Sequence, residues 1–230
     1  SELSQAVFQS VRDVYRTELP HYFKYVSGGD ESTEPKLEHV SGLDGEHPQA
    51  VVNVPAGTGD WFGGWDGDVV PQAERYANRD ASSGRMVELI ERRQPAVMLC
   101  HWPGMYTHGT GQGFERFKEV VLALEGRYRE QTIWMKISEI GRYWAARELT
   151  RIQRQGDRVT LTAPYAAKDF TLRIPRTAAS PPQLLVEDRV QPLQGISDRR
   201  RLASATWLAD GDGVIVCFDL PKGSSALSLA

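Results

Sequence analysis

The sequence is poor in cysteine and has no long apolar run. Only two of its 230 residues are cysteines, Cys100 and Cys217, and each stands in a short apolar stretch. Such isolated positions favour two buried thiols over a disulfide framework or a zinc cage. No apolar run approaches the roughly 18 residues that cross a bilayer, so we expect a soluble chain with no membrane partner.

The chain also has no large excess of charge of either sign. Its 27 lysines and arginines stand against 30 aspartates and glutamates, and the longest basic cluster is Arg199-Arg200-Arg201. Because affinity for nucleic acid comes mainly from many basic contacts with phosphates, this balance argues against a nucleic-acid partner. No signal-peptide pattern follows Ser1, so we expect that a signal peptide is absent or was removed. The cellular location stays open, and so does the question of whether the chain is a fragment.

Apolar residues recur at helical spacing in four segments of the first 150 residues, namely 3–15, 83–93, 114–124 and 137–144. Short apolar runs of strand length occur at 50–54, 96–100 and 132–135, and each is followed by a loop and a helix. A strand, a loop and a helix in this order are typical of parallel β/α units. We therefore predict an α/β domain over residues 1–150.

The helical period ends near Thr150, and short alternating runs follow at close spacing. These runs are 158–162, 170–174, 184–186, 202–208 and 213–220. Clusters of Pro, Gly, Asp and Ser separate them, as turns between strands require. The pattern predicts an all-β sandwich module over residues 151–230.

The segment 60–68 combines three aspartates, two tryptophans and three glycines after the predicted strand 50–54. In α/β folds, loops after strands carry ligands, and tryptophan faces beside carboxylates suit a sugar ring. Asp60 and Asp66 are candidate catalytic carboxylates, and Trp61 and Trp65 are candidate substrate-binding residues. Two alternatives stay open: a rigid glycine-rich loop with a structural role, and a Ca²⁺ site on the aspartates.

A second segment, 99–109, contains two histidines and two large aromatic residues. His101 follows the predicted strand 96–100, at the edge where such folds place catalysis, and an imidazole there can donate or accept a proton near neutral pH. Trp102, Tyr106 and His108 lie on the same loop and could line the same pocket as substrate-binding residues. The alternative for each histidine is a structural role.

The order of Asp60-Trp61, Leu99-Cys100-His101 and Ser138-Glu139-Ile140 resembles the C-terminal half of the NodB-type polysaccharide deacetylases over roughly residues 50–150. The resemblance implies a distorted β/α barrel in which a divalent metal, commonly zinc, activates water against an acetyl group on a carbohydrate. It implies that His101 is the general acid toward the leaving group. It also implies that Asp60 and Trp61 line the active-site groove.

The metal-ligand motifs of that family are missing from this chain. No Asp-Asp pair occurs, and no two histidines are four residues apart. A metal site that generates hydroxide needs about three protein ligands, so we expect no metal ligands and no cofactor in this chain, and zinc is implied by the resemblance alone. Either the N-terminal half of the barrel is missing from the chain, or the fold is a partial barrel without the metal.

Two functions follow from the sequence, and both are directed at carbohydrate. The first is a hydrolase of the polysaccharide deacetylase or glycosidase kind, with His101 as acid and Asp60 or Asp66 as its carboxylate partner. The second is a non-catalytic carbohydrate-binding or assembly protein in which Trp61, Trp65 and Trp102 form a stacking surface. A missing N-terminal half and a homo-oligomer are the protein partners left open.

Overall fold

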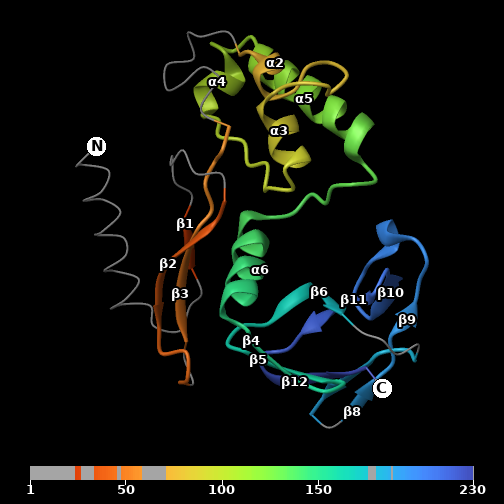
Figure 1. Cartoon of the computed structure of the whole chain (residues 1–230). Coiled ribbons are helices and arrows are strands. Elements are labelled where there is room, and N and C mark those ends of the chain that lie inside the picture. The colour runs from red at the N-terminus through yellow and green to blue at the C-terminus, as the bar shows by residue number, and fades with distance from the viewer. Residues whose placement is uncertain are drawn as a thin grey trace. The chain divides into compact units, whose positions relative to one another are not determined.

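The computed structural model of the chain describes residues 24–26, 34–45, 48–58, 71–175, 180–187 and 189–229 (Figure 1). These residues form two compact units. The described residues of 25–36 and 53–137 make up the first, the helical unit, and Lys24 with the described residues of 37–52 and 138–230 makes up the second, the sheet unit.

The helical unit contains four helices: α2 (Ala73–Tyr76), α3 (Arg85–Glu91), α4 (Trp102–Tyr106) and α5 (Gln112–Tyr128). Figure 1 shows α5 as the long helix of this group, and it packs against α2 and α4. The apolar residues of α5 that recur every three or four positions, Val120, Leu124 and Tyr128, are buried with Tyr76 and Met86 in one core cluster. Burial of these side chains holds the short helices in place.

One polar contact joins two helices of this core. The Tyr128 hydroxyl donates a hydrogen bond of 2.7 Å to the Glu91 carboxylate at the end of α3. Burial is the largest cause of the raised pKa of Tyr128, and this hydrogen bond adds to it. The protonated phenol therefore links α5 to α3.

The sheet unit begins with one helix and continues almost wholly in strands. Helix α6 (Ile137–Leu149) leads into β4 (Arg151–Gln155) and β5 (Arg158–Ala163). The remaining strands are β6 (Ala167–Pro175), β7 (Gln183–Val186), β8 (Arg189–Gln191), β9 (Gln194–Gly195), β10 (Thr206–Asp210), β11 (Gly213–Leu220) and β12 (Gly223–Ser228), with a 3₁₀ turn at Arg199–Arg201.

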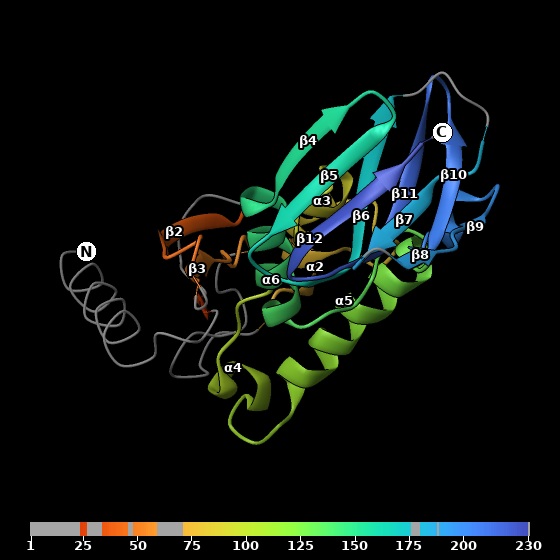
Figure 2. The same ribbon diagram turned by 90° about the horizontal axis from the view of Figure 1, so that it is seen from below.

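These strands form two sheets. One has the order β6-β11-β10-β9, and the other has the order β4-β5-β12-β7-β8, in which Figure 2 shows β4, β5 and β12 side by side. Alternate residues of each sheet, such as Leu161, Leu227, Phe170 and Phe218, are buried in a single core cluster that also takes in Ala146 of α6. In β5 the period of two places one row of side chains in the core and the other outside, whereas β11 is buried on both faces.

A third sheet, with the order β1-β3-β2, is formed by β1 (Lys24–Val26), β3 (Gln49–Asn53) and β2 (Lys36–Ser41). The central strand β3 is the most buried of those whose side chains are described, since Ala50, Val51 and Val52 are all in the core. This strand coincides with the apolar run at 50–54, and that prediction is confirmed.

The predicted fold class, a partial or distorted β/α barrel followed by a β-sandwich module, is wrong. More of the described residues lie in strands than in helices, and the strands form three separate sheets. Among the strand pairs whose register is given for the described residues, only β9 with β10 is parallel. The β/α order in the sequence therefore does not build a parallel barrel here.

Two of the predicted barrel strands are not strands. Residues 96–100 form no strand beyond a single bridge residue, Leu99. The Thr58 hydroxyl donates to the Val97 carbonyl and accepts from the Leu99 amide, at 3.3 and 3.1 Å. A side chain thus takes the hydrogen bonds that a neighbouring strand would make. Residues 132–135 are also irregular, and their apolar side chains Ile133, Trp134 and Met135 are exposed.

Other local predictions are confirmed. Helices α3, α5 and α6 lie where the helical spacing predicts them, and β5, β6, β7 and β11 coincide with alternating runs.

Cys217 is buried and Cys100 is exposed, so the expectation of burial is wrong for Cys100, and neither forms a disulfide. The predicted division of the chain at residue 150 stays a prediction. Within the described residues, none of the helices combines the length and apolar character that crossing a membrane requires.

Candidate functional site

The segment from His101 to Gly113 carries four of the residues singled out from the sequence. His101 has an extended backbone, with φ −109° and ψ 148°, and α4 begins directly after it with Trp102 and Pro103. Proline suits the first turn of a helix because its missing amide hydrogen has no partner there in any case. Since no strand precedes His101, its predicted place at the edge of a barrel strand is wrong, while its predicted catalytic role stays a prediction.

The end of α4 is a sharply turned loop. Thr107 and His108 both have positive φ, 45° and 51°, a backbone conformation that residues other than glycine rarely adopt. The Tyr106 carbonyl accepts hydrogen bonds from the amides of Gly109 and Gly111, at 3.0 and 2.9 Å. These contacts fold the loop back on the helix and bring the chain round to the start of α5.

A buried threonine fixes α4 against α5. The Thr107 hydroxyl donates to the Gly104 carbonyl at 2.9 Å and accepts from the Gly113 amide at 3.0 Å, and both contacts are buried. The two backbones approach so closely that a Cβ built on Gly113 would overlap the Gly104 carbonyl oxygen. The helix that carries the candidate residues is therefore held by backbone contacts, which make a rigid support.

Trp102 and Tyr106 form an exposed aromatic pair on this support. They are four residues apart on α4, so they lie on one face, and their ring centroids are 5.9 Å apart at an angle of 23°. Trp102 is 73% exposed and Tyr106 is 61% exposed. Large aromatic side chains left this accessible on a rigid element offer flat apolar surface, with the indole N–H and the phenol as polar groups.

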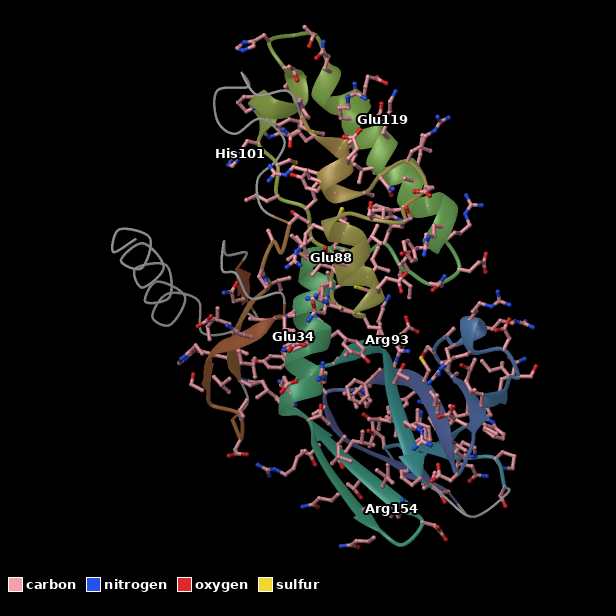
Figure 3. All side chains as sticks on the ribbon, turned by 45° about the horizontal axis from the view of Figure 1, so that its top comes forward. Glu34, Glu88, Arg93, His101, Glu119 and Arg154 are labelled. Carbon is pink, nitrogen blue, oxygen red and sulfur yellow. The ribbon has the colours of Figure 1, made fainter. Side chains whose placement is uncertain are left out.

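The two histidines flank the aromatic pair in the sequence. His101 is partly buried and His108 is exposed. In Figure 3 the His101 side chain lies on the side of the helical unit opposite to Glu119 of α5. Imidazole nitrogens can donate and accept hydrogen bonds, so His101 and His108 can supply polar contacts at either end of α4.

Four predicted site residues lie outside the described residues: Asp60, Trp61, Trp65 and Asp66. The structure therefore brings together Trp102 and Tyr106 among the predicted residues, on the one segment that also carries His101 and His108. The roles predicted for the other four stay predictions.

The divalent metal that the resemblance implies would need about three nitrogen, sulfur or oxygen ligands held together. Within the described ranges, no group of three or more His, Cys, Asp and Glu side chains is arranged to hold a metal ion. These residues do not fit the implied metal, and we derive no chemical step through it.

A cavity in the sheet unit was not indicated by the sequence. It has a volume of about 320 Å³, and its lining includes Leu43, Arg151, Thr162 and Lys222. These residues come from four separate segments, so no local spacing connects them. Only the sheet register, which places Arg151 opposite Thr162, brings them together.

Comparison of the chain with protein-family models, with curated proteins and with solved structures gives no match.

Proposed function

We infer that this chain is a carbohydrate-binding protein whose contact surface is the Trp102–Tyr106 pair. The observation that carries this proposal is the exposure of two stacked aromatic rings on a helix fixed by buried hydrogen bonds between the Thr107 hydroxyl and two backbone groups. A sugar ring has an apolar face of C–H groups and a rim of hydroxyls. The apolar face matches an indole or phenol ring, and the rim matches the polar groups around it.

The support of α4 favours binding because it lowers the entropy lost on association. Side chains that are already ordered lose less freedom when a ligand binds. The Thr107 contacts and the close approach of Gly104 to Gly113 hold the backbone beneath the pair in the free protein. The mutual stacking of Trp102 and Tyr106 restricts the rings themselves.

His101 and His108 extend the proposed surface with polar groups. Hydroxyl groups of a sugar both donate and accept hydrogen bonds, and a neutral imidazole can do either at each nitrogen. Trp61 and Trp65, which lie outside the described residues, are proposed to add stacking surface as the sequence predicts. A hydrolase of the deacetylase or glycosidase kind, with His101 as its acid, stays a prediction beside this proposal.

Calorimetric titration with acetylated and free oligosaccharides tests the proposal. We expect Trp102→Ala and Tyr106→Ala each to weaken binding of the recognised oligosaccharide by about 1–3 kcal/mol, or roughly 5- to 150-fold. Trp134→Ala is the matched control, because Trp134 is 62% exposed but lies outside the pair. Its affinity should stay within about twofold of the unchanged chain.

Three results would contradict the proposal. The first is that the unchanged chain binds none of the neutral or acetylated oligosaccharides. The second is an equal loss of affinity in all three variants, which would show that the loss does not come from the pair. The third is full affinity in both Trp102→Ala and Tyr106→Ala.

A further inference from the structure

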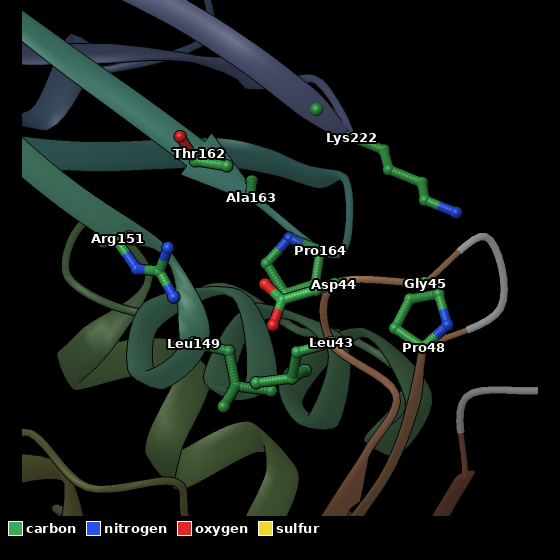
Figure 4. Close-up of a pocket in the computed structure, with 11 residues that line it drawn as sticks. Leu43, Asp44, Gly45, Pro48, Leu149, Arg151, Thr162, Ala163, Pro164 and Lys222 are labelled. Atoms are coloured by element: carbon green, nitrogen blue, oxygen red, sulfur yellow. The ribbon is translucent and has the colours of Figure 1, made fainter.

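The cavity of the sheet unit lies where one end of the five-stranded sheet meets the loop between β2 and β3 (Figure 4). Its volume of about 320 Å³ is at the lower end of the range for small-molecule sites, which start near 300 Å³. Arg151 opens β4, Thr162 lies opposite it in β5, and Ser224 of β12 continues the same row. The cavity therefore stands at the end of a row that crosses three strands.

The charged groups around this cavity are Arg151, Lys222 and Asp44. Arg151 is exposed, and within the described part of the chain its guanidinium makes no hydrogen bond or ion pair with another side chain. The positive charge of Arg151 is thus not offset by an ion pair among the described residues. A guanidinium presents paired donors that match the two oxygens of a carboxylate, so an anionic group of that shape is favoured here.

Part of the cavity lining is apolar. Leu43, Leu149, Pro48 and Pro164 line it, and Figure 4 shows Leu43 and Leu149 next to each other below Asp44 and Pro164. A ligand for this cavity therefore needs an apolar face as well as an anionic group. A simple inorganic anion lacks such a face.

The sheet face that leads away from the cavity is mostly polar and carries no acidic residue; its apolar members are Ala226, Leu185 and Val190, of which Ala226 is 3% exposed. The register of the five strands places twelve side chains on the side opposite to the core. They are Arg151, Gln153, Gln155, Arg158, Thr160, Thr162, Ser224, Ala226, Ser228, Gln183, Leu185 and Val190. The hydroxyl, amide and guanidinium groups of this face can hydrogen-bond to a chain of sugars. Its positive charge is complementary to the negative charge of an acidic oligosaccharide.

We propose that this cavity binds a carboxylate-bearing sugar unit of an acidic oligosaccharide, whose chain continues over the outward face of the five-stranded sheet. The Arg151 guanidinium pairs with the carboxylate, Thr162 and Asp44 contact hydroxyls, and the apolar wall packs on the C–H face of the ring. Carbohydrate as the ligand class rests on the proposed function, whereas the anionic unit follows from the charges at the cavity.

The test compares a trimer of glucuronic acid with the matching neutral glucose trimer by calorimetric titration of the full chain. Arg151→Gln should weaken binding of the acidic trimer at least about tenfold, because a bidentate charged contact is lost. Arg189→Gln is the matched control, since Arg189 is an exposed arginine of the same sheet on the opposite edge strand β8. The affinity of Arg189→Gln for the acidic trimer should equal that of the unchanged chain. The affinity of the unchanged chain for the acidic trimer should fall as the salt concentration is raised.

Each result separates this site from the aromatic pair. Loss of acidic-trimer binding in Arg151→Gln, with Trp102→Ala unaffected and the neutral trimer bound more weakly than the acidic one, supports the cavity. Equal affinity of the unchanged chain for both trimers, or equal affinities of Arg151→Gln and Arg189→Gln, would overturn it. Inorganic phosphate that competes at the concentration of the trimer would also overturn it, because the cavity would then be a general anion site. Failure of the acidic trimer to bind overturns the cavity proposal alone, since the aromatic pair is tested by neutral and acetylated ligands.

Discussion

Ser225 carries a hydroxyl that is buried without a hydrogen-bond partner among the described residues. It lies in β12 opposite Leu161, on the core side of the sheet, and is 4% exposed. A buried hydroxyl that cannot replace its hydrogen bonds to water destabilises the folded state. We expect Ser225→Ala to raise the free energy of unfolding by about 1 kcal/mol, measured by urea denaturation.

Ser224 provides the control for this prediction, because its side chain is exposed on the other side of the same strand. Ser224→Ala should change the free energy of unfolding by less than about 0.5 kcal/mol. A loss of stability in Ser225→Ala greater than that in Ser224→Ala would show that the Ser225 hydroxyl stabilises the core.

Tyr165 gives the sheet unit an alkaline sensitivity. Burial raises the pKa of its phenol to about 12, above the ordinary value of 10. In the unfolded chain the phenol loses its proton near pH 10, whereas in the folded chain it keeps the proton to higher pH. The unfolded state therefore binds fewer protons between pH 10 and 12, and stability falls as pH rises through that range.

Tyr165→Phe removes this titration. The partial exposure of the side chain reduces the effect. Between pH 8 and pH 11 we therefore expect the free energy of unfolding of the unchanged chain to fall by about 1 kcal/mol more than that of Tyr165→Phe. Urea denaturation at the two pH values measures this difference. Parallel loss of stability in both proteins would show that Tyr165 is not the group responsible.

At the scale of single residues, the sequence analysis singles out Trp102 and Tyr106 but expects them on a loop, whereas they lie on α4, and it does not indicate the cavity. Trp102 and Tyr106 are four residues apart in one short segment, so a helix is enough to bring them together. Arg151, Thr162 and Lys222 meet only through strand register and a turn, and a one-residue change of register would send Thr162 to the other face. Their convergence is a property of the folded sheet.

Among the elements, α4 depends on its close approach to α5. Gly113→Ala should lower the free energy of unfolding by at least about 2 kcal/mol, because the added Cβ overlaps the Gly104 carbonyl oxygen, a backbone atom that cannot turn away. Gly126→Ala, in the same helix, meets nothing within 4 Å and should raise it by about 0.5–1 kcal/mol. Chemical denaturation of the two variants measures both effects.

The opposite signs expected for the two glycines make this comparison informative. If Gly113→Ala were as stable as Gly126→Ala, the two backbones could not be as close as the structure places them. The proposed rigidity beneath Trp102 and Tyr106 would then lose its basis.

Elements with strong periodicity were predictable, and isolated apolar runs were not. Helix α5 repeats its apolar residues over several turns, and β11 is bounded by the turn at Asp210–Gly213. Residues 96–100 have an equally apolar sequence, but an apolar run alone does not say what will satisfy its backbone hydrogen bonds. Thr58, which satisfies two of them, lies 39 residues before Val97 in the sequence.

At the scale of the whole chain, the two proposed binding surfaces belong to different units. The aromatic pair lies in the helical unit, and the cavity with its sheet face lies in the sheet unit. The barrel expected from the order of short motifs would have placed all site residues in one domain. The order of motifs did not determine the fold, because β/α alternation requires strands that pair with one another. Residues 96–100 have only the single bridge residue Leu99, and residues 132–135 form no strand.

The central claim is that Trp102 contacts carbohydrate, and ¹⁹F NMR of the chain labelled with 5-fluorotryptophan tests it most directly. The Trp102 and Trp134 resonances are assigned from the Trp102→Phe and Trp134→Phe variants. Titration with the oligosaccharide recognised in calorimetry should shift the Trp102 resonance to saturation while the equally exposed Trp134 resonance stays in place. A Trp102 resonance that does not move while the oligosaccharide binds, or that moves no more than that of Trp134, would contradict the account.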